Sequence, residues 1–533
     1  MLLNDPARPG FIQCYDPATL QKLGEVKAMT AEEVNEVVAK AAAAQVEWAK
    51  TSFKERKRVL QTMQEYFLAH QDDIVRVACR DSGKSKVDAL LGEVLVTCEK
   101  FRCTWAHGAA WLAREKRPAG PLLPHKTAYV EYHPLGVLGV IAPWNYPCHN
   151  VFNHVASGLF AGNAVVTKVS EYTSWSSRYF GAIAREALRA CGHSPDLCAI
   201  VTGFGEAGAA LVACPQVAQI IFTGSPGVGR KVAAAAAPLL KPVILELGGK
   251  DPMVVCDDAR VAAVLPFALR GVFQNCGQNC CGVERVYAYA AVYDAFCAAA
   301  ARAVAALRQG PALGRDDVDC GAMVMPAQLD IVQALVDDAV AKGARLLAGG
   351  RRNARFPDGL FYEPTVLADV THDMRIAREE VFGPVMCILK VPDDSDATAA
   401  ALVNDCAYGL GASVFSGDAA RGARLARALR CGMASVNDFA VFYMAQALPF
   451  GGVKDSGYGR FAGPEGLRAC CLLKSVVEDT VPFIRTVIPG LLQYPIAPGG
   501  LQFARAMVGV TYGAGAWAKA RAVAQMVSAM WKK

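Results

Sequence analysis

The feature that most constrains the fold is a repeated alternation of short apolar segments with helical ones. AVVTK (164–168) precedes a helical pattern at 176–191, CAIVTGFG precedes EAGAALVAC, and AQIIFTG precedes SPGVGRKVAAAAA. Strands that alternate with helices build a parallel sheet with helices on both of its faces. We therefore predict a doubly wound α/β domain around these segments.

A second region shows the same alternation. After ELGGKD (246–251), the strand patterns PMVVCDD, ERVYAYA and GARLLAGG recur between helical segments. With 533 residues, the chain is too long for one compact core. The expected fold class is α/β, with two doubly wound parallel-sheet domains. ALPFGGVKDSGYGR (447–460) adds a glycine-rich loop, and CLLKSVVE (471–478) after it predicts an exposed strand.

The first hundred residues are expected to be mostly helical. Apolar residues recur at helical spacing between 30 and 117, and Thr30 with Glu33 forms the capping box that starts such a helix. From about residue 120, YVEYHPLGVLGVIAPWNYP first alternates and then becomes a continuous apolar run. Both patterns are typical of strands that enter a sheet.

Composition narrows the class of protein. The chain is 53% hydrophobic and 20% charged, which is typical of a globular protein. Its 19 cysteines have no regular spacing, so we expect free thiols in a reducing compartment, and its eight histidines form no metal-binding pattern. MLLNDPARPG is not a signal peptide. We expect an intracellular protein, cytoplasmic or bound peripherally to a membrane, unless a targeting segment precedes this start.

The whole net charge of +6 lies in the tail beyond residue 480. The tail has no acidic residue, and without it the chain has 49 basic and 49 acidic residues. A nucleic-acid footprint would be stronger and spread over a folded face, so no nucleic acid is expected as a partner. The basic residues of the tail are Arg485, Arg505, Lys519, Arg521, Lys532 and Lys533.

The last residues of the tail predict an amphipathic helix. Its apolar positions recur at i, i+3, i+4, i+7 and i+8, with Arg521 and Lys532 on the opposite face. Such a helix could pack on the protein body, form an oligomer contact, lie on an anionic membrane surface or stay disordered. Prolines and glycines between 486 and 504 argue against a spanning helix there. The apolar positions are Val523, Met526, Val527, Met530 and Trp531.

Two glycine-rich turns follow predicted strands. The helix N-terminus after GSPGVG, which runs from Gly224 through Ser225 to Gly229, could hold a pyrophosphate through free N–H groups and the helix dipole. Glu171, just after the strand that ends at Lys168, could bind ribose hydroxyls. A tight turn and a lone surface glutamate explain these patterns equally well. The other turn is GFGEAG (203–208).

GQNCCG (277–282) places two cysteines side by side, Cys280 and Cys281, and spacing alone does not say which is a nucleophile. Glu246 in ELGGKD could act as a general base, and Asn145 in PWNYP could donate a hydrogen bond to an oxyanion. Together a thiol, a carboxylate and an amide fit thioester chemistry. Taken singly, a capping glutamate and a turn asparagine are the simpler interpretations.

In their order along the chain, these motifs resemble the aldehyde dehydrogenase superfamily, most closely its plant and fungal branch with hydrophobic extensions. The resemblance covers about residues 12–475 and rests on PWNYP, GNAVVTKVSE, FTGS, ELGGK, GQNC, EEVFGP and PFGGVKDSGYGR. It implies an NAD(P)-binding domain at 1–115 and 135–247 and a catalytic domain at 248–447. It further implies an oligomerisation element at 116–134 and 448–479, followed by the tail at 480–533.

The resemblance also implies a mechanism. Cys280 would attack an aldehyde, Asn145 and the Cys280 N–H would bind the oxyanion, and Glu246 would activate the water that hydrolyses the thioester. Glu246 favours water over coenzyme A as the acceptor, although a CoA-acylating enzyme and a catalytically silent scaffold are the alternatives. A small-molecule aldehyde is the expected partner, and a homodimer or homotetramer is the expected assembly.

The cofactor implied by the resemblance is NAD, with NADP as the second option, because Glu171 would face a 2′-phosphate. Two departures from the family pattern stand out: Val169 replaces the usual proline of K-P-S-E, and Asn279 precedes the nucleophile. The apolar tail slightly favours lipid-derived aldehydes. The cofactor contacts implied by the resemblance are Lys168, Glu171, Trp144, Gly224, Ser225, Gly229, Glu380 and Phe382.

Overall fold

The computed structural model, which describes residues 3–531, confirms the α/β fold class. It contains a six-stranded and a seven-stranded sheet, both mostly parallel, and a small three-stranded antiparallel sheet. The chain divides into two compact units. The main unit comprises residues 1–112 and 134–472, and the tail unit comprises residues 113–133 and 473–533.

The six-stranded sheet is wound in both directions from a central strand, β5. Its order is β17-β9-β8-β5-β6-β7, so the chain leaves β5 toward β7 and then returns to the other side of β5. Ligands of such sheets bind where the strand order reverses, at the carboxyl ends of the strands. The strands are β5 (Val137–Ile141), β6 (Ala164–Lys168), β7 (Cys198–Val201), β8 (Val217–Gly224), β9 (Val243–Leu247) and β17 (Gly457–Tyr458), and the helices between them are α6 (His149–Phe160), α7 (Ser174–Ala190), α8 (Gly205–Ala213) and α9 (Pro226–Ala236).

The amino-terminal part of the main unit is helical, as the sequence predicts. The capping box is confirmed, because Thr30 and Glu33 each accept a hydrogen bond from the other's backbone N–H. The helical prediction is wrong at its end, where residues 115–117 form a strand that pairs with 128–130. The elements are β1 (Phe11–Tyr15), β2 (Lys22–Lys27), α1 (Ala31–Trp48), α2 (Phe53–Ala69), α3 (Gln71–Ser82), α4 (Lys86–Ala89), a π-helical segment (Leu90–Leu95) and α5 (Val96–Trp111).

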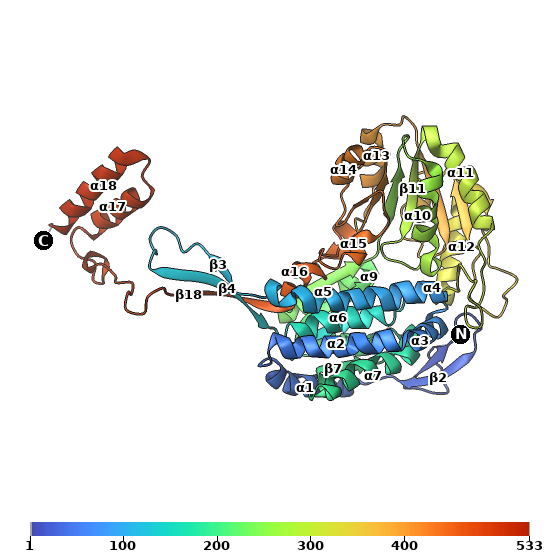
Figure 1. Ribbon diagram of the computed structural model, residues 1–533, viewed down its shortest axis with the longest axis horizontal. Coiled ribbons are helices and arrows are strands. Elements are labelled where there is room, and N and C mark those ends of the chain that lie inside the picture. Colours follow the sequence, from blue (N-terminus) through green and yellow to red (C-terminus); the bar gives the residue numbers. More distant parts are fainter. Residues whose placement is uncertain (1–2, 532–533) are drawn as a thin grey trace. The chain divides into compact units, whose positions relative to one another are not determined.

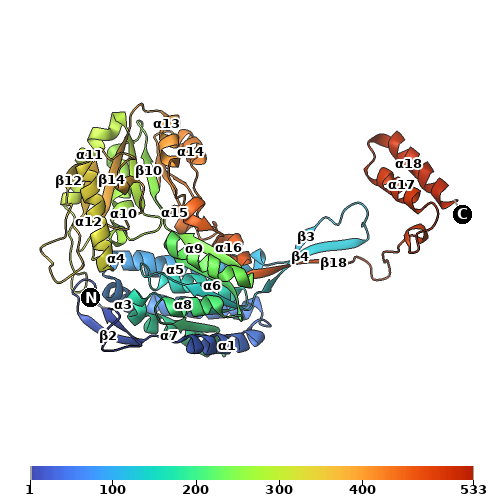
Figure 2. The same cartoon turned by 180° about the vertical axis from the view of Figure 1, so that it is seen from behind.

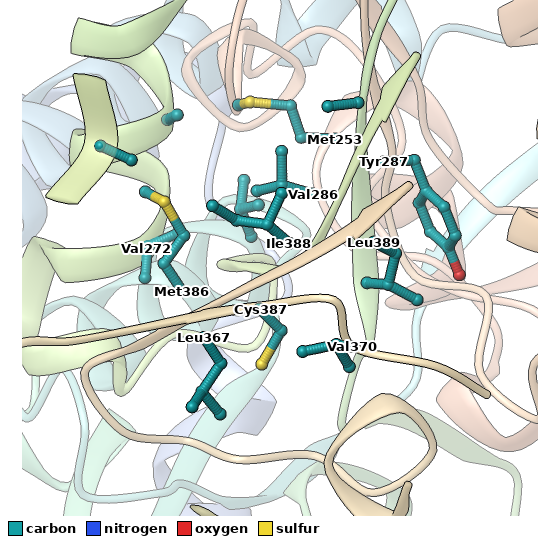
Figure 3. Packing of buried hydrophobic residues seen from close by; sticks show 14 of the residues in the cluster. Met253, Val272, Val286, Tyr287, Leu367, Val370, Met386, Cys387, Ile388 and Leu389 are labelled. Atoms are coloured by element: carbon teal, nitrogen blue, oxygen red, sulfur yellow. The ribbon is translucent and has the colours of Figure 1, made fainter. Parts of the chain in front are cut away.

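The seven-stranded sheet forms the second layered region and holds the largest apolar core. Met253, Val286 and Ile388 come from three adjacent strands and belong to one apolar cluster with Val272 of α10 (Val261–Phe273) (Figure 3). The order is β12-β13-β14-β11-β10-β15-β16, with β12 antiparallel at the edge. The strands are β10 (Asp251–Val255), β11 (Val283–Tyr289), β12 (Arg345–Ala348), β13 (Thr365–Ala368), β14 (Val385–Val391), β15 (Ser413–Phe415) and β16 (Ser435–Val436).

Helices cover both faces of this sheet (Figure 1, Figure 2). All three strands expected after residue 251 are present as β10, β11 and β12. The covering helices are α10 (Val261–Phe273), α11 (Ala290–Ala305), α12 (Pro326–Ala341), α13 (Asp396–Asn404) and α14 (Ala419–Ala428), and two short helices follow, α15 (Val441–Met444) and α16 (Gly463–Ala469).

The tail unit holds most of the three-stranded sheet and a helical hairpin. The sheet order is β18-β4-β3, from β3 (Glu115–Arg117), β4 (Lys126–Pro134) and β18 (Cys471–Asp479), which confirms the exposed strand after the glycine-rich loop. The hairpin is formed by α17 (Gly500–Tyr512) and α18 (Gly515–Met530), and both figures show the two helices side by side. Among residues 3–531, no helix is long and apolar enough to cross a membrane.

The predicted tail helix is present, but its apolar stripe is not its packing face. Ala522 and Ala529 are the buried residues of α18, and Ala522 lies against Gly509 of α17. Val527 and Met530 are 49% and 64% exposed. Small side chains decide this contact because they let the two helix backbones approach closely. The predicted polar position Lys532 and the basic Lys533 lie outside the described residues.

Candidate active site

The carboxyl ends of four neighbouring strands bring the predicted motifs to one edge of the six-stranded sheet. The pairing sets Ile141 of β5 beside Lys168 of β6 and Phe222 of β8, and Gly224 beside Leu247 of β9. The loops that follow these strands contain PWNYP, KVSE, FTGS and ELGGK. A cavity of about 650 Å³ opens at this edge.

The cavity gathers most of the predicted site residues on one wall. The three expected catalytic residues, Asn145, Glu246 and Cys280, all line it. Lys168, Glu171 and Gly229 are described by the structure but do not line this cavity. The expected cofactor contacts on the wall are Trp144, Gly224, Ser225, Glu380 and Phe382.

The two adjacent cysteines have different surroundings. Cys280 is half-buried and contacts the Glu246 carboxyl, whereas Cys281 is 9% exposed and packs in an apolar cluster with Phe442 and Phe450. The pKa of the Cys280 thiol is raised well above its usual value by the hydrogen-bonding Cys281 thiol, by burial and by the charge of Glu246. Cys280 therefore needs a proton acceptor to become a thiolate, and its contact Glu246 is one.

Glu246 is the buried carboxyl of the site. It lies on β9, is 2% exposed and interacts with the side chains of Cys280 and Thr223, while its Oε1 has no hydrogen-bond partner among residues 3–531. Burial raises the pKa of Glu246 to about 7. A carboxyl with a pKa near neutrality exchanges protons readily at physiological pH, which is the property that a general base requires.

The side chain of Asn145 is oriented from both ends of its amide. Its Oδ1 accepts a hydrogen bond from Asn150 Nδ2 at 3.1 Å, and its Nδ2 donates to the carbonyl of Gln278 at 3.1 Å. The amide nitrogen carries two hydrogens, so the second remains available for a developing oxyanion. The loop before Cys280 is held in an uncommon conformation, because Asn275 and Cys276 both have positive φ angles of 53° and 57°.

A buried ion pair that the sequence did not reveal supports the Asn145 loop. Lys84 and Glu93 are fully buried and lie 2.6 Å apart, and Lys84 also donates to the backbone carbonyl of Asn145 at 2.8 Å. The second oxygen of Glu93 accepts the N–H groups of Cys148 and His149, at 3.1 and 2.8 Å. Removing one partner of such a pair costs about 3–5 kcal/mol.

A second buried ion pair supports the EEVFGP loop in the same way. Lys250 and Glu284 lie 2.7 Å apart, and Glu284 accepts the N–H groups of Val381 and Phe382 at 3.0 Å each. Phe382 has a positive φ of 49°, so this loop also needs a fixed backbone. Nothing in the local sequence near residues 84, 93 or 284 predicts these contacts. Lys250 and Glu284 are 34 residues apart, and Lys84 and Glu93, nine residues apart, meet at the separate segment that contains Asn145.

The residues on the cofactor side fit a dinucleotide. Helix α9 begins beside the cavity with Ser225 as its N-cap, and the Ser225 side chain accepts no capping hydrogen bond, which leaves the first N–H groups for an anion. Glu380 is half-buried beside Gly249, whose N–H donates to it at 2.9 Å, and desolvation of its carboxyl raises the pKa of Glu380 to about 8. Trp144 and Phe382 meet edge to face, with centroids 5.5 Å apart.

The remaining expected contacts lie around this side. Lys168 and Glu171 form an ion pair of 3.2 Å at the carboxyl end of β6. Val169, which replaces the usual proline, donates its N–H to the carbonyl of Val201 at 3.1 Å, a hydrogen bond that proline cannot make. Gly229 faces β9, where a Cβ would lie 2.5 Å from a methyl group of Leu247. Gly229 therefore permits close packing of α9 on the sheet.

Within residues 3–531, no three His, Cys, Asp or Glu side chains come together in a way that could hold a metal ion. All 19 cysteines are free thiols.

Comparison with known proteins identifies the family to which the chain belongs. The chain matches the aldehyde dehydrogenase family over residues 5–476. An aldehyde dehydrogenase-like protein of Schizosaccharomyces pombe is 42% identical over 507 residues, which cover 94% of this chain and 96% of that protein. The mitochondrial succinate-semialdehyde dehydrogenase of Arabidopsis thaliana is 36% identical and covers 86% of this chain and 84% of its own length.

A solved structure has the same fold and holds the expected cofactor. The Mycobacterium tuberculosis aldehyde dehydrogenase complexed with NAD⁺ superposes with a TM-score of 0.83 at 31% identity, and the match covers 91% of this chain and 97% of that one. The family match, the relatives and the shared fold agree with one another. The chain belongs to the aldehyde dehydrogenase family, whose members oxidise aldehydes with NAD(P)⁺.

Proposed function

We propose that this protein oxidises an aldehyde to a carboxylate with NAD, through a covalent intermediate on Cys280. The observation that carries the proposal is the contact between the Cys280 thiol and the buried Glu246 carboxyl, beside the oriented amide of Asn145. This set supplies a nucleophile, a base and an oxyanion donor on one cavity wall.

The first half of the reaction forms the covalent intermediate. Glu246 takes the proton of the Cys280 thiol, and the thiolate adds to the aldehyde carbon to form a C–S bond. The free N–H of Asn145 Nδ2, with the N–H of Cys280, binds the resulting oxyanion of the thiohemiacetal. When bound, NAD would supply the two-electron oxidation, by hydride transfer, that converts this thiohemiacetal into a thioester on Cys280.

The second half of the reaction hydrolyses the thioester. Glu246 first returns its proton to solvent, since it must be ionised again to act as a base. It then removes a proton from water, the hydroxide adds to the thioester carbon, and the C–S bond breaks to release the Cys280 thiolate and the carboxylic acid, which loses its proton to solvent. Trp144, Ser225, Glu380 and Phe382 would hold the cofactor, with Glu380 placed for ribose hydroxyls.

The decisive experiment assays the purified chain with a panel of aldehydes against NAD and NADP, with and without coenzyme A. We expect NADH without coenzyme A, and we expect Glu246→Gln to give a fast NADH burst followed by slow turnover. Full steady-state turnover of Glu246→Gln in the absence of coenzyme A would exclude Glu246 as the hydrolytic base. A requirement for coenzyme A would favour the acylating alternative.

We also propose that the tail unit binds an anionic membrane surface at an intracellular membrane. Its helical hairpin exposes Trp517 at 90% and Trp531 at 83%, and Arg505, Lys519 and Arg521 lie in the same segment without any acidic residue. Exposed tryptophan side chains among basic residues are typical of helices that lie at the membrane interface. Exposed apolar surface of this kind marks an interaction site in a soluble protein.

Vesicle co-sedimentation tests this second proposal. The full chain should pellet with phosphatidylserine-containing vesicles and much less with neutral ones, and added salt should weaken the binding. Trp517→Ser should reduce the bound fraction, whereas Leu240→Ser, which removes a 91% exposed apolar side chain from the main unit, should not. Equal binding of both variants would contradict the proposal.

Members of the family are generally oligomeric, and we propose a homodimer or homotetramer that pairs through β18. This strand lies at the edge of its sheet and exposes Leu472, Leu473 and Val477 by 55–60%. An uncovered edge strand offers unpaired N–H and C=O groups to a second copy. Leu473→Asp should shift the mass measured by light scattering toward the monomer, and an unchanged mass would place the interface elsewhere.

A further inference from the structure

The substrate side of the cavity is apolar and carries almost no net charge. Leu91, Leu95 and Val96 line one part of it, and Phe450 and Phe461 line another. Among the described wall residues, Arg270 is the only side chain with a permanent charge, and Asp88 neutralises it at a distance of 2.8 Å. Apart from the ionisable carboxyls of Glu246 and Glu380 on the catalytic and cofactor sides, the wall therefore offers no free countercharge to an anionic or a cationic aldehyde.

Helix α6 interrupts this apolar wall with neutral polar groups. Asn153 and His154 line the cavity and are 3% and 5% exposed. The Asn153 amide makes no hydrogen bond with any residue between 3 and 531, and its Oδ1 is completely buried. A buried amide without a partner costs about 1–3 kcal/mol, so a fold keeps one where a ligand or an ordered water completes it.

The imidazole of His154 has a similar surrounding. It packs edge to face on Phe461, with centroids 5.5 Å apart, and forms no hydrogen bond within the described chain. Burial, together with the charge of Lys100, lowers the pKa of His154 to about 3, so the ring is neutral at physiological pH. A neutral imidazole has one N–H donor and one acceptor nitrogen, and a side-chain amide has a donor NH₂ group and an acceptor oxygen.

The polar groups follow the cavity away from the reacting thiol. His149 bonds to the hydroxyl of Tyr443, and Tyr443 packs on the cluster that includes Cys280 and Cys281. Asn153 lies one helical turn further along α6, about 6 Å along its axis. Of these residues, His149 is the one linked through Tyr443 to the cluster beside Cys280, so a group bound by Asn153 would belong to a part of the substrate remote from the aldehyde carbon.

We propose that Asn153 and His154 form a neutral subsite for a hydroxyl group carried at a distance from the aldehyde on an otherwise apolar chain. A hydroxyl both donates and accepts, so it can bond to a neutral amide or to a neutral imidazole. A carboxylate or an ammonium group would have to lose its hydration without gaining a countercharge. This inference rests on the proposed aldehyde oxidation and defines its substrate class.

The experiment compares three series of aldehydes of increasing length on the full chain with NAD: unsubstituted, ω-hydroxy and ω-carboxy. At the length that reaches the subsite, kcat/KM of the hydroxy aldehyde should exceed that of the unsubstituted one by roughly tenfold, the value of one net hydrogen bond. The ω-carboxy series should be the poorest.

Two variants on α6 assign the preference to the subsite. Asn153→Leu should bring the ratio of hydroxy to unsubstituted kcat/KM to about one, and His154→Phe should lower it in the same direction. Met444→Leu, which changes an apolar wall residue of similar volume, should leave the ratio intact. Thermal unfolding and NAD binding check that each variant is folded.

The outcomes separate this inference from the function on which it rests. If unsubstituted aldehydes are oxidised but the hydroxy series has no advantage at any length, the subsite is wrong and the oxidation stands. A ratio that persists in both α6 variants, or a preference for the ω-carboxy series, also overturns the subsite. If no aldehyde in the three series yields NADH, the proposed function itself fails.

Discussion

Helices α6 and α18 depart from an ordinary amphipathic helix in opposite ways. Helix α6 buries polar side chains, whereas α18 exposes apolar ones. In α6 almost every residue is buried, including His149, Asn153 and His154. In α18 only Ala522 and Ala529 are buried, and the larger apolar residues face water. Buried polar groups and exposed apolar groups both cost free energy in an isolated chain, so each helix points to something that it binds.

The two cysteines of GQNCCG provide the largest expected effect on the cavity side. Cys280→Ser should lower kcat by about 10⁴-fold or more, because a hydroxyl is a far weaker nucleophile than a thiolate. Cys281→Ser should retain most of the activity, since Cys281 packs in an apolar cluster. Steady-state NADH formation measures both. If the two variants were equally active, Cys280 would not be the nucleophile.

Asn145 tests whether the cavity wall also binds the developing charge. Asn145→Ala should lower kcat by about 10²–10³-fold, the effect of removing one oxyanion donor. Single-turnover NADH formation measures the affected step directly. The neighbouring Asn150→Ala, which removes only the hydrogen bond to Asn145 Oδ1, should have a smaller effect. A reversed order of the two variants would assign the donor to Asn150.

The pH profile tests the buried carboxyl of Glu246. Because hydrolysis needs the ionised form and the pKa is raised to about 7, kcat should be constant above pH 7 and fall about tenfold per pH unit below it. Glu246→Gln should lack this inflection. The same inflection in the variant would mean that another group, for example Glu380 with its pKa near 8, controls the rate.

The smallest expected effect concerns α18 and should leave the cavity untouched. Trp517→Ser should weaken vesicle binding by about tenfold, because it removes a large aromatic side chain from the interface. Its kcat with a soluble aldehyde should remain that of the unmodified chain. If Trp517→Ser lost much of its activity in the absence of vesicles, α18 would contribute to catalysis and not only to membrane binding.

Local patterns in the sequence predicted the parts of this protein that depend on local physics. The alternation around 164–236 predicted the parallel sheet, Thr30 and Glu33 predicted a helix start, and the strand at 471–478 is present. Side-chain periodicity and capping involve residues only a few positions apart, so a single sequence contains the needed information. The order of the motifs along the chain indicated the family, and the resemblance to that family implied the site residues.

Tertiary structure alone decided the remaining features. Residues 115–117 form a strand only because β4 offers them hydrogen bonds, and the packing face of α18 depends on α17. The bond from the Lys84–Glu93 ion pair to the distant Asn145 loop and the unpartnered amide of Asn153 become visible only in the folded chain. Their free energy comes from burial and from contacts across the fold, and a local sequence pattern records neither.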